Sequence, residues 1–253
     1  MLKGLALTPP VVGRIAIGKV VERNGKRLPE KDDEFTLTSQ VQTRDGWVNH
    51  PLNEVLRGGG PGLGGYSSYS SGFSETQSGE NSENAGNVGT NKPASNPAKG
   101  KLRSIPVRLL FDDPDLNFRA NYSMFDKQTG RPLCVGNGES CKRVTASGAQ
   151  SLVCEGPDFC DYAQGRCKPY GRLNVQVAQD DELSSFVFRT TGFNSIRTLA
   201  TRLRYLHAAS GGLLSTLPLE LRLRGKSTVK SHRAPIYYVD LLLRSGQSFS
   251  AQI

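Results

Sequence analysis

Histidine is scarce in this sequence, and the motifs in which it usually does chemistry are missing. The three histidines, His50, His207 and His232, are scattered, and none stands in a His-x-x-x-His or His-x-Glu arrangement. The sequence has no Gly-x-Ser-x-Gly motif and no glycine-rich phosphate-binding motif between a strand and a helix. No motif indicates catalysis, so a binding function is favoured over an enzymatic one.

Long apolar runs are missing as well. No stretch approaches the roughly 20 residues that a membrane-spanning helix needs. The apolar run at 1–7 is too short for a signal peptide and meets Pro9 and Pro10 at once. We therefore expect a soluble protein of the cytoplasm that has no membrane partner.

Cysteine is absent outside one segment, 134–167, which is rich in glycine, proline and polar residues. Its five cysteines are Cys134, Cys141, Cys154, Cys160 and Cys167. The segment has too few apolar side chains to pack alone, and an odd cysteine count fits a secreted disulfide framework poorly. Four thiolates can close a tetrahedral structural site, so we predict a zinc loop that binds Zn²⁺. Disulfides or free thiols are the alternative. A catalytic zinc is disfavoured, because four thiolates leave no position open for water.

The segment 58–100 lacks the apolar residues of a folded unit. It is dominated by Gly, Ser, Asn and Glu, and such a composition cannot bury enough apolar surface to offset its ordering entropy. We predict a disordered linker. Its aromatics Tyr66, Tyr69 and Phe73 would suit stacking on bases or on a partner, but incidental aromatics in a flexible linker are the favoured reading.

Acidic residues are rare towards the C-terminus. The chain has a net charge of +9, and 193–244 contains nine Lys or Arg against only Glu220 and Asp240. This excess favours an acidic partner, nucleic acid included. The candidate contacts lie on the polar sides of predicted elements: Arg197, Arg202, Arg204, Arg222 and Arg224. The alternative is a solvated basic face without a partner.

Periodicity predicts many strands and one main helix. Alternating apolar residues indicate strands at 11–21, 34–41, 107–111, 118–124, 173–177, 186–189, 219–224 and 236–243. The period changes to helical at 193–206, where Asn194 or Thr191 is the expected N-cap. The strand at 236–243 is apolar on both faces and is predicted to be central.

These elements give an α+β fold, a strand-rich single domain with one main amphipathic helix, a zinc loop and a disordered insert. The predicted parts are an N-terminal part of the core (1–57), the linker (58–100), the main domain (101–245) and a polar tail (246–253). We expect a charged connection at 22–33 and a hairpin formed by 107–111 and 118–124. The carboxylates at 112–115 between them are interpreted as turn residues.

Several blocks of the sequence resemble recombination directionality factors of phage and mobile-element serine integrases. The N-terminal blocks are GRIAIG at 13–18 and LPEKDDEFTLTS at 28–39. The later blocks are Cys160-x6-Cys167 followed by Gly171-Arg172-Leu173, then FRTTGFNSIR at 188–197, LPLELRLR at 217–224 and PIYYVDL at 235–241. The resemblance covers most of the ordered chain and rests on the order of these blocks.

The resemblance implies a protein that binds a serine integrase and redirects it from attP and attB towards excision at attL and attR. It implies no catalysis and a bacterial host cell, although relatives are often labelled hydrolase or metal-binding protein. The cysteines that match the family's cluster are Cys141, Cys154, Cys160 and Cys167, with Cys134 as the alternative ligand. DNA would be contacted directly or through the integrase. The runner-up functions are a zinc-containing nucleic-acid-binding accessory protein of a phage recombination module and a metal-dependent hydrolase.

Overall fold

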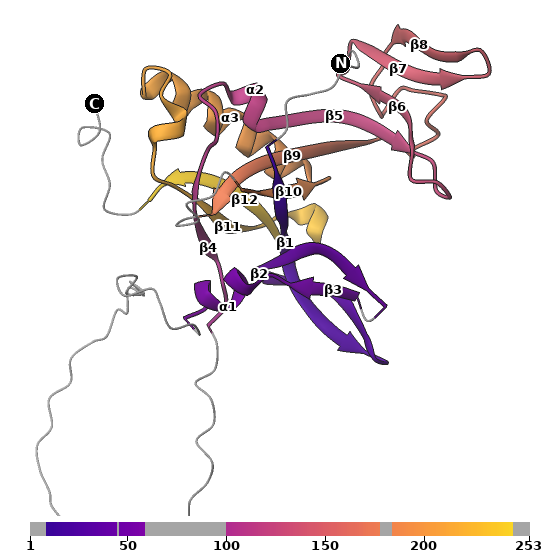
Figure 1. Ribbon diagram of the computed structural model, residues 1–253. Coiled ribbons are helices and arrows are strands. Elements are labelled where there is room, and N and C mark those ends of the chain that lie inside the picture. The colour runs from indigo at the N-terminus through magenta and orange to yellow at the C-terminus, as the bar shows by residue number, and fades with distance from the viewer. Residues whose placement is uncertain (1–8, 45, 59–99, 178–183, 245–253) are drawn as a thin grey trace, which may run out of the picture.

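The computed structural model describes residues 9–44, 46–58, 100–177 and 184–244 (Figure 1). Strands make up 51% and helices 18% of the structure, so the predicted strand-rich α+β class with one main helix is confirmed. The predicted linker at 58–100 lies outside the described residues except at its two ends, and the tail at 246–253 lies outside them entirely.

The elements follow one another as a run of strands with few helices. The strands are β1 (Val11–Arg23), β2 (Lys26–Thr43), β3 (Gly46–Asn49), β4 (Ser104–Arg108), β5 (Phe118–Phe125), β6 (Pro132–Gly136), β7 (Ser140–Thr145), β8 (Gly148–Val153), β9 (Lys168–Val177), β10 (Ser185–Thr190), β11 (Leu219–Ser227) and β12 (Pro235–Leu243). The helices are α1 (Pro51–Leu56), α2 (Pro114–Asn117) and α3 (Phe193–Ala209), with short 3-10 turns η1 (Leu214–Thr216) and η2 (Val229–Ser231).

Most of the strands form one long sheet in the order β3-β2-β1-β10-β9-β5-β6-β7-β8. β1 is antiparallel to β2 and parallel to β10, where Ile15 is level with Phe188. The backbone N–H of Ser185 donates to the carbonyl of Pro10 at 2.8 Å and anchors this parallel pair. Residues from before and after the segment 58–100 therefore share the centre of one sheet.

β9 is the strand at which the sheet divides. Its first residues pair with β5, and its end pairs with β4, where Val107 is level with Val177. β4 also pairs with β11, and β11 pairs with β12. The same edge of β9 thus starts two wings, one that leads to β8 and one that leads to β12.

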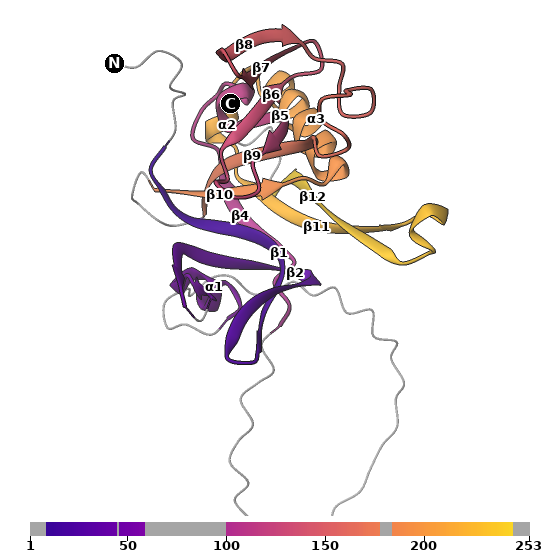
Figure 2. The same cartoon turned by 90° about the vertical axis from the view of Figure 1, so that its right-hand side faces the viewer.

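The core lies between the sheet and α3 (Figure 2). Leu199, Leu203 and Leu206 share the buried face of α3, which packs against β12 and β9. The buried Ser195 hydroxyl accepts a hydrogen bond at 3.1 Å from the N–H of Val239 and ties the helix to β12. Within the described ranges, no helix combines the length and the apolar character needed to cross a membrane.

Three local expectations are wrong. β1 and β2 continue through the expected connection 22–33 and meet at Asn24 and Gly25, which take the positive φ values of a tight turn (53° and 70°). The segments 107–111 and 118–124 form no hairpin with each other, because β4 and β5 both pair with β9. β12 is not central: among the described residues it pairs with β11 and no other strand, and its apolar inner face is covered by α3.

Candidate functional site

Strands β6, β7 and β8 form an arm that extends the sheet beyond the core (Figure 1). β6 pairs with the outer half of β5, where Met124 is level with Cys134, and β7 and β8 follow as antiparallel neighbours. All six residues of β8 are exposed. The arm therefore has little apolar core of its own, and its strands are held by backbone pairing and by the contacts of the cysteine side chains.

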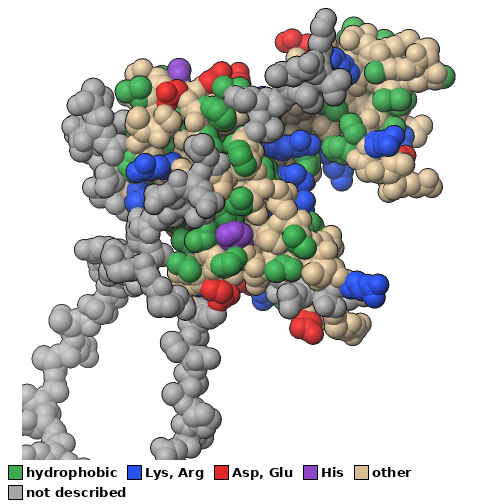
Figure 3. Space-filling view, viewed as in Figure 1, with side chains coloured by type: hydrophobic (Ala, Val, Ile, Leu, Met, Phe, Trp, Pro, Cys, Tyr) green, Lys and Arg blue, Asp and Glu red, His purple; other side chains and the backbone are tan. Residues whose placement is uncertain are grey.

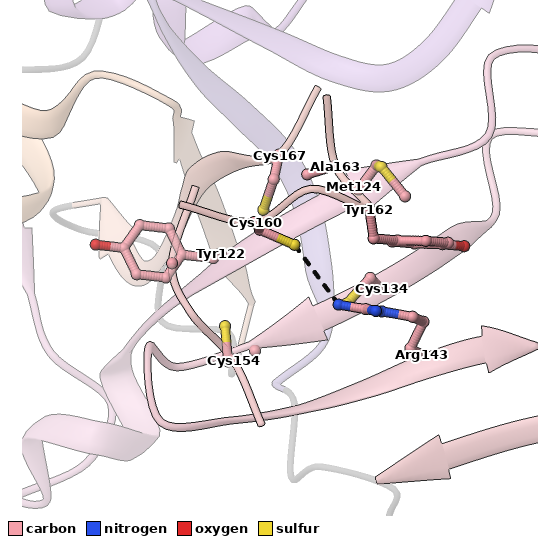
Figure 4. A pocket seen from close by; sticks show the side chains of 11 residues that line it. Tyr122, Met124, Cys134, Arg143, Cys154, Cys160, Tyr162, Ala163 and Cys167 are labelled. Atoms are coloured by element: carbon pink, nitrogen blue, oxygen red, sulfur yellow. Dashed lines mark hydrogen bonds between the residues drawn. The ribbon is translucent and has the colours of Figure 1, made fainter. Parts of the chain in front are cut away.

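The arm brings the cysteines together. Cys134 lies on β6 and Cys141 on β7, while Cys154 directly follows β8. The other two belong to the segment that returns from β8 to β9. Four side chains, those of Cys134, Cys154, Cys160 and Cys167, line one small cavity (Figure 4).

Glycine at position 136 makes room for this cluster. A Cβ atom there would lie 2.7 Å from the Sγ atom of Cys154 and 2.7 Å from the Cβ atom of Cys141, closer than real Cβ contacts. β6 therefore passes close beside the Cys154 sulfur atom. The free volume between the side chains is about 10 Å³, which is room for one water-sized particle and excludes an organic substrate. The cavity is suited to holding an ion.

Cys141 differs from the other four cysteines. It is buried, and its thiol donates a hydrogen bond to the carbonyl of Val153 at 3.6 Å. Burial, followed by interaction with Cys134, raises the pKa of the Cys141 thiol. Its side chain shares the sheet face of Cys134 and lies near Cys154, although it is not among the residues that line the small cavity.

Arg143 supplies positive charge at the edge of the cluster. Its Nη2 atom lies 3.6 Å from the Sγ atom of Cys160, and its guanidinium carbon lies 4.1 Å from the centre of the Tyr162 ring. Hydrogen bonding to Cys134 is the main cause of its raised pKa. A zinc ion together with four bound thiolates would carry a net charge of about −2. Arg143 is placed to offset part of this charge. The sequence analysis missed this residue, although it faces Cys134 across the strand register.

The donor chemistry and the size of the cavity fit zinc, whereas the arrangement of the side chains is not that of a closed metal site. Among the described residues, no three His, Cys, Asp or Glu side chains are arranged to hold a metal ion. The fit thus rests on thiol convergence, the small volume and the nearby guanidinium. The ligand set and the presence of Zn²⁺ stay predictions.

The predicted contact arginines separate into two groups. Arg202 and Arg224 both pair with Asp240, with N–O distances of 3.0 and 3.5 Å, and Arg222 pairs with Glu220. The two acidic residues of this region thus compensate three of the five arginines. The other two, Arg197 and Arg204, are exposed on the outer face of α3.

The arm also exposes apolar side chains that the sequence analysis did not single out. Phe159 is 81% and Val153 76% exposed, and Val144, Leu152 and Tyr162 are further exposed apolar or aromatic residues of the same arm. Such side chains, gathered on one projecting element, are typical of a surface that contacts another macromolecule. Their signal in the sequence is weak, because each stands among glycines and polar residues.

Comparison with known families shows to which family the chain belongs. Its sequence matches the model of the Gp3-like family, which is described as recombination directionality factor-like, over residues 12–244. The matched part runs from β1 to the end of β12 and includes the cysteine arm. No curated protein and no solved structure matches the chain. The resemblance of the sequence blocks is confirmed, and the chain belongs to the recombination directionality factor-like family.

Proposed function

We propose that this protein is a recombination directionality factor that binds a site-specific serine integrase and biases it towards excision at attL and attR. The observation that carries the proposal is the family match over residues 12–244, which supports a recombination-related role. In this proposal the protein acts by binding and performs no catalysis of its own.

We further propose that the arm is the surface that contacts the integrase. β8 is the last strand of the sheet, so one of its edges carries backbone N–H and C=O groups that pair with no other strand among the described residues. Exposed edges of this kind bind partner strands, and the neighbouring side chains of Val153 and Phe159 provide apolar area. A stable protein contact draws most of its affinity from a few such anchors.

The test combines integrase binding with a recombination assay on attL and attR substrates. The change is Val153→Ser with Phe159→Ser, and the matched control is Val229→Ser, which removes a 90% exposed apolar side chain from η2. Each hot spot is worth about 2 kcal/mol or about 30-fold in affinity, so loss of both anchors should weaken integrase binding by roughly 700-fold. Excision should fall in parallel, and the control should behave as wild type.

The outcomes separate the function from the surface. A wild-type protein that neither binds the cognate integrase nor changes the direction of recombination would rule out the proposed function. If the wild-type protein is active and the arm variant binds the integrase normally, the arm is not the contact surface, but the proposed function still stands. In that case the exposed charges of Arg197 and Arg204 on α3 are the next candidates, tested by replacing both with Glu.

We also propose that the arm is held by one structural zinc ion, bound by Cys134, Cys154, Cys160 and Cys167. These four side chains line the same cavity, whereas the Cys141 thiol is directed to the carbonyl of Val153. The set differs from the one that the family resemblance implies, which has Cys141 in place of Cys134. Bound zinc would supply structural stability to a segment with few buried apolar residues.

Zinc content measured by elemental analysis tests this ligand set. The purified chain should hold about one zinc per molecule, Cys134→Ser should lose it, and Cys141→Ser should keep it. Cys160→Ser is the positive control for loss. Retention of zinc by Cys134→Ser together with its loss from Cys141→Ser would restore the set implied by the resemblance. A metal-free wild-type chain with an unchanged melting temperature would exclude zinc.

A further inference from the structure

The sheet has a second face, which α3 does not cover. Alternation along β9 places Gly171 and Leu173 on the helix side, where a Cβ atom on Gly171 would lie 2.9 Å from Ile196. The residue between them, Arg172, therefore points to the opposite side. α1 lies on the helix side too, since His50, which caps it, contacts the core residue Phe186 at a ring distance of 4.9 Å.

Arginines form a row across this open face. In the strand register Arg172 on β9 is level with Arg189 on β10 and with Arg119 on β5. Arg14 on the next strand, β1, lines the same hollow as Arg189. Neighbouring strands are about 4.8 Å apart, so the four guanidinium groups cover a width of about 15 Å.

The four strands that carry the row place no acidic side chain beside it. The positions of β1, β10, β9 and β5 that share the parity of Arg172 in the paired register contain no Asp or Glu. None of the four arginines forms a salt bridge with a described residue, whereas Arg202, Arg222 and Arg224 each pair with an acidic side chain. Burial, followed by the charge of Arg189, lowers the pKa of Arg14, as expected for cations that face one another without a counterion.

Two aromatic rings belong to the same face and are already engaged. The guanidinium of Arg14 lies 4.3 Å from the Trp47 ring centre, and that of Arg172 lies 4.9 Å from the Tyr170 ring centre. Two hollows open beside them, of about 260 and 420 Å³. Figure 3 shows Lys and Arg side chains gathered in the recess between the arm and the β1–β3 part of the sheet.

We propose that this open sheet face binds duplex DNA through its phosphates, with Arg14, Arg119, Arg172 and Arg189 as contacts. Over about 15 Å a duplex presents about nine phosphate charges, which complements an acid-free row of arginines. Protein–DNA interfaces are strongly positive and polar, whereas the centre of a protein–protein interface is depleted of charge. Single strands need free aromatic rings for base stacking, and here guanidinium groups already occupy one side of each ring.

DNA binding by this face goes beyond integrase binding and is independent of it. The exposed apolar side chains of the arm and the four arginines belong to different segments of the chain, so the chain can contact a protein and the DNA beside it at once. The contact is made to the backbone, so it discriminates little between sequences. It would hold the protein close to the recombination site while the arm contacts the integrase.

The experiment measures binding of the full chain to a labelled duplex of unrelated sequence, by fluorescence anisotropy, without integrase and over a series of salt concentrations. The change is Arg172→Ala with Arg189→Ala. The matched control is Arg197→Ala with Arg204→Ala, which removes the same charge from exposed sites on α3. Loss of two phosphate contacts should reduce the salt slope by about 1.8 and weaken binding by about 60-fold at roughly 0.1 M salt.

The control variant should bind as wild type, and a labelled single strand should bind more weakly than the duplex. Equal weakening by the two variants would show that net charge alone matters and would overturn the proposal. Absence of wild-type binding at low salt would overturn it too, as would tighter binding of the single strand. Integrase binding measured in parallel is unaffected by these outcomes, so a failure here leaves the proposed function standing.

Discussion

Asn117 offers the sharpest test of how the two wings of the sheet are joined. This fully buried side chain at the end of α2 forms hydrogen bonds to the loop between β4 and α2 with both the oxygen and the nitrogen of its amide. Its Oδ1 atom accepts from the N–H groups of Leu110 and Phe111, each at 3.2 Å. Its Nδ2 atom donates to the carbonyls of Phe111 at 2.6 Å and Asp113 at 2.9 Å. It thereby fixes the chain where β9 exchanges β4 for β5 as its neighbour.

The change Asn117→Ala removes all four hydrogen bonds. A net value of about 1 kcal/mol for each would give about 4 kcal/mol. The loop is partly exposed, and water can satisfy some of the freed groups, so we expect a loss of about 3 kcal/mol. Urea unfolding followed by circular dichroism measures it. The matched control is Asn121→Ala, an exposed position on β5 that should change stability by less than about 0.5 kcal/mol.

A second variant checks the physical cause. Asn117→Asp keeps the acceptor for the two N–H groups but turns an ionised oxygen towards the carbonyls of Phe111 and Asp113. Its penalty at neutral pH should exceed that of Ala and should shrink on acidification, when the protonated carboxyl can donate again. An Asn117→Ala variant that unfolds at the same urea concentration as Asn121→Ala would refute the reasoning.

Two further predictions follow from local packing and from charge. Gly171→Ala should destabilise the fold by about 1 to 3 kcal/mol, because its Cβ atom would press on Ile196 at 2.9 Å and Phe118 at 3.0 Å. The control Gly225→Ala meets nothing closer than 3.4 Å and should be near neutral by the same unfolding assay. Hydrogen bonds from the backbone and side chain of Ser215 lower the pKa of Asp112. Its stabilising effect is therefore complete above the unfolded carboxyl pKa of about 4 and is lost as the pH falls below it. Unfolding midpoints measured from pH 6 down to pH 3 should fall less for Asp112→Asn than for wild type, and parallel curves would contradict the assignment.

The elements that local periodicity defines were predictable. The helix at 193–206 was confirmed because its apolar residues repeat every three to four positions and need no distant partner to be recognised. Its cap was not predictable. The helix begins after Gly192 without a side-chain cap, and the Asn194 side chain accepts from Lys226 at 2.8 Å instead. That contact joins residues that are far apart in the chain.

Strand pairing was the part that sequence patterns could not supply. Alternation marks β4 and β5 as strands equally well whether they pair with each other or with β9, so the nearest partner was chosen wrongly. The arm strands were missed for another reason. β8 is exposed along its whole length, so it shows no apolar alternation.

The candidate site was only partly predictable from sequence. Clustering of the cysteines in 134–167 indicated a common site, and the structure does bring their side chains together. Cys134 lines the cavity, whereas the Cys141 thiol is hydrogen-bonded to the carbonyl of Val153, and spacing in the sequence does not reveal this difference. The row of arginines on the open sheet face could not be predicted from the sequence. Its members, Arg14, Arg119, Arg172 and Arg189, come from four separate strands.

The parallel pairing of β1 with β10 has a consequence for how the chain folds during synthesis. β1 ends at Arg23, whereas its second neighbour, β10, begins only at Ser185, so the ribosome makes the two strands far apart in time. At about 5 to 20 residues per second, β1 waits about 10 to 30 seconds for that partner. Until then the hairpin of β1 and β2 has one unpaired edge, and the apolar side chains of Ile15, Phe35 and Leu37 have no complete core to enter. A nascent chain that stalls before β10 is made would therefore expose these apolar side chains to chaperones and proteases.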